Sequence, residues 1–78
     1  MLFSVTSVNS QDTYKILTDE TDPDNIYVGE ALPGTSILSP SWRIKLINTT
    51  GSVTSILYAD STSAFTKIWN NRVSYTYN

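Results

Sequence analysis

The chain of 78 residues contains neither cysteine nor histidine. Without cysteine no disulfide can hold the fold together, and without both residues the usual thiolate and imidazole sites for zinc or iron are excluded. Histidine is also a common base for activating a nucleophile, and so short a chain offers little room for a substrate cleft. We therefore predict that the protein is not an enzyme and carries no cofactor.

Charge is also scarce, since only 15% of the residues are Asp, Glu, Lys or Arg and the formal net charge is −2. Nucleic-acid binding normally requires a basic patch, so we expect no nucleic-acid partner. No apolar run approaches the ~18 residues of a membrane span, and the first residues lack the basic and apolar regions of a signal peptide. These absences predict a protein made in the cytoplasm with no membrane partner.

Short runs of β-branched and aromatic residues are abundant, and clusters of Gly, Pro, Asn, Asp and Ser separate them. This pattern is typical of all-β proteins. It predicts one domain over 1–78, built as a small β-sandwich or barrel of about six short antiparallel strands. The expected strands lie at 2–8, 13–18, 26–28 within the stretch 25–32, 41–47, 53–60 and 72–77.

The clearest element is a hairpin over 41–60 with a loop at 48–52. Symmetrical pairing about this loop sets Trp42 opposite Tyr58 and Ile44 opposite Ile56, on one face together with Leu46. A one-residue slip would exchange the two faces, so the apolar stripe is expected to fix the register.

One helical turn is predicted near 62–69, because Phe65, Ile68 and Trp69 follow the i, i+3, i+4 spacing of a helix. Asn70 and Asn71 are expected to end it, since Asn tolerates the left-handed conformation found at helix ends. The residues predicted to form the core or to anchor assembly are Trp42, Ile44, Leu46, Tyr58, Phe65, Ile68 and Trp69.

Three further side chains are candidates for an interface: Arg72, Tyr75 and Tyr77. Aromatic rings among Ser, Thr and Asn residues suit a sugar-binding or protein-binding surface. The same rings can equally belong to the core of so small a domain. Arg72 can clamp a carboxylate, with Glu30 or Asp60 as partner, or stack on an aromatic ring.

The acidic stretch at 19–25 is expected to be a loop, because Pro23 cannot donate to a sheet ladder. Asp19, Asp22 and Asp24 are weak candidates for a calcium site, since calcium prefers oxygen ligands on flexible loops. This stretch lacks the order of residues found in an EF-hand loop. We therefore favour a solvated turn and predict no bound metal.

Several segments together resemble a group of small proteins encoded among the virion genes of tailed bacteriophages. The segments are 27–31 (YVGEA), 33–35 (PGT), 41–45 (SWRIK), 58–60 (YAD), Phe65, 68–72 (IWNNR) and 74–75 (SY). The resemblance spans roughly 27–77, about two thirds of the chain. In that group position 58 is commonly Trp and glycine follows the Asp, whereas this chain has Tyr58 and Ser61.

The resemblance implies a structural component of a phage particle, such as a capsid decoration protein or a neck, tail or fibre accessory. The expected localisation is the virion, and the expected partners are other virion proteins. A core this small rarely supplies more than ~3–5 kcal/mol, so a homo-oligomer is also expected. The alternative is a β module on the virion surface that binds a glycan or receptor.

Overall fold

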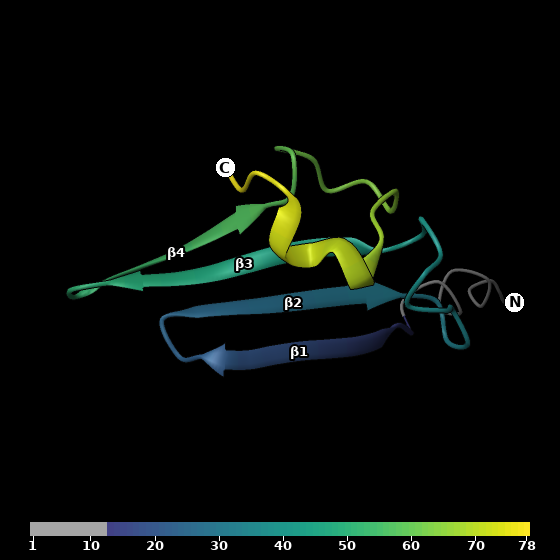
Figure 1. The fold of residues 1–78 in the computed structure, drawn as a ribbon, viewed down its shortest axis with the longest axis horizontal. Helices are drawn as coiled ribbons and strands as arrows, with labels where there is room; N and C mark the ends of the chain where they lie inside the picture. The colour runs from purple at the N-terminus through teal and green to yellow at the C-terminus, as the bar shows by residue number, and fades with distance from the viewer. Residues whose placement is uncertain (1–12) are drawn as a thin grey trace, which may run out of the picture.

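The computed structural model describes residues 13–78, and one open antiparallel sheet dominates it (Figure 1). Its strands are β1 (Lys15–Asp22), β2 (Asn25–Ala31), β3 (Arg43–Thr50) and β4 (Val53–Tyr58), in the order β1-β2-β3-β4. A 3-10 helix, η3 (Trp69–Ser74), follows near the C-terminus. The mostly β class is confirmed, but the sheet does not close into a barrel, and within residues 13–78 it has no second sheet to make a sandwich. The expected strand at 2–8 lies outside the described residues.

The first hairpin extends through the acidic stretch that we predicted to be a loop. Asp22 pairs with Asn25, so the turn contains only Pro23 and Asp24. The Asp22 carboxylate closes this turn by accepting hydrogen bonds from the Asp24 amide and the Asn25 side chain, each at 3.0 Å. A register shift between Asp19 and Asp22 marks a β-bulge. The loop prediction was wrong because proline removes an amide donor only at its own position and favours an extended conformation in the residue before it, so the ladder can run up to Asp22.

The second hairpin has a tighter turn than expected, and its register differs from the prediction. Thr50 pairs with Val53 across the two residues Gly51 and Ser52, and Gly51 adopts a left-handed φ of 61°. Lys45 therefore lies opposite Tyr58, where we expected Trp42. The offset of three residues is odd, so it turns the side chains of β4 to the opposite face.

The predicted helical turn at 62–69 is wrong in place, because residues 62–68 are not helical and only Trp69 belongs to a helix. Lys67 is extended there and exchanges two backbone hydrogen bonds of 2.9 Å with Trp42. The helical turn comes later, as η3, and includes the asparagines that were expected to end it. The last predicted strand, at 72–77, is reduced to an isolated bridge between Tyr77 and Ala59.

One face of the sheet, the inner face, carries the core. Figure 1 shows η3 lying across β2 and β3, and Trp69 from this helix packs on the sheet. A Cβ atom on Gly29 would meet the Trp69 ring, with Cζ3 only 2.7 Å away, so a strand glycine makes room for the indole. The buried apolar residues are Ala31, Trp42, Ile44, Ala59 and Trp69, and the partly buried ones against them are Leu17, Tyr27, Tyr75 and Tyr77.

Candidate interaction surface

The other face of the sheet, the outer face, has no comparable cover among residues 13–78. Side chains alternate between the two faces along a strand, and residues directly opposite each other on neighbouring strands share a face. The register of the sheet therefore identifies which residues of each strand lie on the outer face. The outer-face residues are Ile16, Thr18, Ile26, Val28, Glu30, Arg43, Lys45, Ile47, Thr49, Thr54, Ile56 and Tyr58.

An apolar row crosses the outer face from β2 to β4. Ile26 lies opposite Ile47, which lies opposite Ile56, and these three residues are named the isoleucine row. Ile56 is 60% exposed, and Ile16 on β1 is 58% exposed. Isolated apolar side chains are common on protein surfaces, but a contiguous row on an uncovered sheet face is typical of an interaction site.

A cluster of charges lies beside this row. Glu30 accepts a hydrogen bond from Arg43 at 2.9 Å, and the Lys45 ammonium lies 3.5 Å from the same carboxylate oxygen. Burial alone would raise the pKa of the Glu30 carboxyl, but Arg43 and Lys45 outweigh that effect and the pKa lies below its usual value. The Glu30 carboxylate therefore stays ionised at neutral pH, and the outer face carries three charged side chains beside the isoleucine row.

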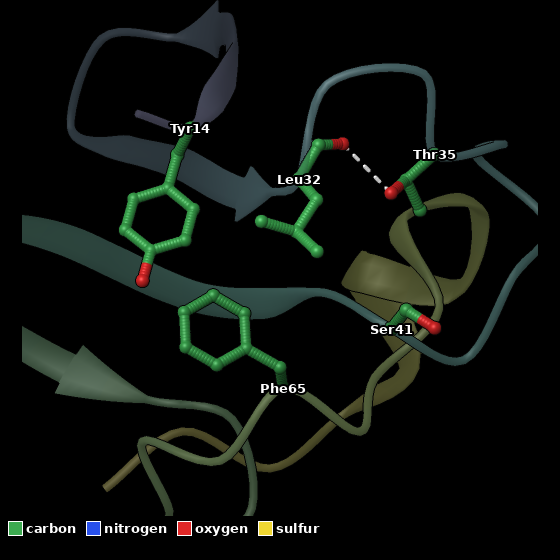
Figure 2. Close-up of a pocket in the computed structure, with 5 residues that line it drawn as sticks. All are labelled: Tyr14, Leu32, Thr35, Ser41 and Phe65. Carbon is green, nitrogen blue, oxygen red and sulfur yellow. Dashed lines mark hydrogen bonds between the residues drawn. The ribbon is translucent and has the colours of Figure 1, made fainter. Parts of the chain in front are cut away.

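The outer face ends in a shallow pocket of about 490 Å³. Figure 2 shows the Tyr14 and Phe65 rings facing one another, with Leu32 between them and the Thr35 hydroxyl, which donates to the Leu32 carbonyl at 2.7 Å. The two rings stack at a centroid distance of 5.3 Å, and the Arg43 guanidinium lies 4.7 Å from the Phe65 ring. Aromatic and hydroxyl side chains together suit a small ligand with polar and apolar parts.

Arg72, a predicted interface residue, is engaged inside the chain. Its Nε donates to Asp19 on β1 at 2.9 Å, and its guanidinium lies 4.7 Å from the Trp69 ring. The predicted carboxylate clamp and the predicted ring stacking thus occur together. Neither carboxylate named as its partner takes part, because Glu30 binds Arg43 and Lys45 while Asp60 lies 3.3 Å from Lys67.

The contacts of Asp19 predict a specific pH dependence. Hydrogen bonds from the Thr21 hydroxyl and amide, and then from Arg72, lower the pKa of Asp19 from 3.8 to about 2. The folded state thus favours the carboxylate, which stabilises the protein above pH 3.8, and this contribution disappears as the pH falls toward 2. Asp19→Asn is expected to show a smaller decrease in melting temperature between about pH 5 and pH 2 than the wild type.

The matched control is Glu20→Gln, whose carboxylate lies on the same strand and accepts a hydrogen bond from Thr18. It is expected to keep the wild-type acid dependence, measured by circular dichroism at a series of pH values. Equal acid profiles for Asp19→Asn and the wild type would contradict the role of the Asp19 carboxylate in the acid dependence.

The two tyrosines that were candidates for an interface also bond within the chain. The Tyr75 hydroxyl accepts from the Ile68 amide at 2.9 Å, and the Tyr77 hydroxyl donates to the Arg72 carbonyl at 2.6 Å. Burial is the largest effect that raises the pKa of Tyr77, and the nearby Tyr27 and Tyr75 raise it further. Both rings pack against the core, so the structure directs them to the inner face.

The predicted anchors are divided between the two faces. Trp42, Ile44 and Trp69 are buried on the inner side, whereas Leu46 and Ile68 are partly buried. Tyr58 and Phe65 are partly buried and lie on the outer side. Sequence reasoning missed the cluster of Glu30, Arg43 and Lys45 and the isoleucine row. The alternation Arg43, Lys45, Ile47 opposite the core stripe was the signal that could have found them.

The weak metal candidates do not converge on a site. Asp19 binds Arg72 and Thr21, and Asp22 binds the turn at Asp24 and Asn25. Within residues 13–78, no group of three or more acidic side chains is arranged to hold a metal ion. The part of the chain that the structure describes also has no helix long and apolar enough to cross a membrane.

Comparisons with known proteins give no match to a family model, to a curated protein or to a solved structure.

Proposed function

We propose that the chain is a structural component of a bacteriophage particle, a capsid decoration protein or a neck, tail or fibre accessory, and that it acts by protein–protein assembly. The observation that carries the assembly role is the isoleucine row, which lies on a sheet face without cover among the described residues. The resemblance of segments such as 41–45 and 68–72 to small virion proteins supports the particle as the place of assembly.

The size of the core supports the same function. Only five apolar residues of the described chain are buried, and two of them are alanines. Removing apolar surface from water stabilises by roughly 25 cal/mol per Å², so a partner on the outer face would add to a small internal contribution. The charges of Glu30, Arg43 and Lys45 beside the row would orient that partner, since charge complementarity fixes register more than affinity.

Particle incorporation tests the proposal. Phage particles are assembled with the wild-type gene replaced by Ile47→Lys, purified on a density gradient and measured by quantitative mass spectrometry for copies of the chain. Lys at position 47 places a charge in the middle of the isoleucine row, so incorporation is expected to fall about tenfold or more, given that each 1.4 kcal/mol is a factor of ten in affinity.

Val73→Lys is the matched control, because Val73 is 68% exposed and lies on η3, against the opposite face. It is expected to be incorporated like the wild type. Absence of the wild-type chain from purified particles would refute the virion role. A glycan-array signal that is lost in Tyr14→Ala would instead support the alternative, a glycan-binding module that uses the pocket of Figure 2.

A further inference from the structure

The two edges of the sheet differ in how they are protected. Natural sheets shield an exposed edge strand with charges, proline or a β-bulge. The edge strand β1 has the charged residues Lys15, Asp19, Glu20 and Asp22 and a bulge. The other edge strand, β4, reads VTSILY and has neither a charge nor a proline, and its pairing with β3 is regular. Only the β4 edge is therefore suited to accept another strand.

The register of the hairpin identifies the backbone groups on this edge. Thr50 pairs with Val53 across a two-residue turn, and the Ala59 amide donates to the Ile44 carbonyl at 3.1 Å. Residues directly opposite alternate in an antiparallel ladder, so Val53, Ser55 and Leu57 bond inward to β3. The amides and carbonyls of Thr54 and Ile56 face outward, and within residues 13–78 they have no backbone partner.

The same edge already accepts backbone at its end. The Tyr58 amide donates to the Asn78 carbonyl at 2.9 Å, and the Asn78 amide donates to the Tyr58 carbonyl at 3.1 Å. This reciprocal pair shows that the outward amide and carbonyl of Tyr58 already bond a second segment of backbone. It also leaves the stretch from Val53 to Leu57 as the part open to an incoming strand.

From these observations we infer that β4 is a self-association site, at which β4 of a second copy of this chain pairs antiparallel with it about a two-fold axis near Ser55. Thr54 of each copy then lies opposite Ile56 of the other, and the two reciprocal pairs give about four hydrogen bonds. This inference rests on the proposed assembly function and names one of its partners.

Charge favours a second copy as the occupant. Antiparallel pairing of β4 with itself brings no like charges together, because the strand is uncharged. The same pairing of β1 would oppose its acidic residues. Thr54 and Ile56 both lie on the outer face, so self-pairing of β4 joins the outer faces of both copies into one surface, with the two Ile56 side chains diagonal to each other across the contact.

Thr54→Pro tests the inference, with Thr54→Val as its matched control. Both variants lose the contact between the Thr54 and Thr49 hydroxyls at 3.2 Å, but only proline removes the outward amide. The wild type and Thr54→Val are expected to form dimers by sedimentation velocity and native mass spectrometry. Thr54→Pro is expected to raise the dimer dissociation constant at least tenfold, and dimerisation of this variant at wild-type strength would overturn the inference.

A second measurement needs no variant and so does not depend on the folding of Thr54→Pro. Hydrogen exchange of the wild type is compared between about 5 and 500 μM protein, concentrations that span a micromolar dissociation constant. The Thr54 and Ile56 amides are expected to become protected at the higher concentration, and unchanged exchange rates would refute the pairing. Ile47→Lys leaves the Thr54 and Ile56 amides free to pair, so this variant is expected to dimerise. If it dimerises in solution but is absent from particles, the β4 contact and particle incorporation depend on different surfaces.

Discussion

Trp42→Ala is expected to leave the chain unfolded at 25 °C. Trp42 is fully buried, its ring lies 5.9 Å from that of Trp69, and its Nε1 donates to the Ser36 carbonyl at 2.9 Å. Truncation of a buried Trp to Ala costs about 3–5 kcal/mol, and a single core of this size rarely supplies more than ~3–5 kcal/mol in total. Far-UV circular dichroism and a one-dimensional proton spectrum measure the outcome.

Leu38→Ala is the control for this truncation, because Leu38 is 65% exposed and comes from the same connection between β2 and β3. A change of less than about 0.5 kcal/mol is expected for it. A folded Trp42→Ala protein with normal chemical-shift dispersion that failed to enter phage particles would instead assign Trp42 to an interface.

The β class and the core stripe were accessible from the sequence for local reasons. Period-two alternation of apolar residues sets which side chains of a strand share a face, and Trp42 and Ile44 follow it before the turn is known. The structure buries both of them. The alternation could not give the register of β4, because the register depends on where the turn lies. Gly51-Ser52 was the available signal, since a Gly-Ser pair between two strand-like runs is typical of a two-residue hairpin turn.

The C-terminal third was beyond local patterns. The spacing of Phe65, Ile68 and Trp69 fits a helix, yet contacts with distant residues decide the conformation. Phe65 stacks on Tyr14, and Lys67 pairs its backbone with Trp42. Weak local propensity is readily overridden by such contacts. The partner of Arg72 was missed for the same reason, since Asp19 lies 53 positions away in the sequence.

The packing of Gly29 against the indoles of Trp42 and Trp69 was also hidden, because a glycine within a strand has several explanations. Gly29 lies opposite Leu17 on β1 and Ile44 on β3, in the middle of the inner face. Trp69 reaches it only after the chain has returned through η3. A strand glycine often marks close approach by another part of the chain, and here the approaching group is an indole from 40 residues downstream.

Gly29→Ala is expected to destabilise the protein by about 1–3 kcal/mol, which is the usual cost of overpacking a well-packed core. The new Cβ would meet the Trp69 ring, with Cζ3 at 2.7 Å, and the Trp42 Cε3 at 3.1 Å. Conformational entropy alone predicts the opposite sign, because Ala in a strand is more stable than Gly by roughly 0.5–1 kcal/mol. Urea denaturation of the two proteins therefore distinguishes packing from propensity by sign.

A double-mutant cycle with Trp69→Phe shows whether the indole is the group that Gly29 accommodates. The smaller ring leaves room above β2, so the cost of Gly29→Ala is expected to be lower in the Trp69→Phe background, with a coupling of about 0.5–3 kcal/mol. Equal costs in both backgrounds would place the strain elsewhere. A smaller cost would establish that η3 and the sheet are fitted to each other through Gly29.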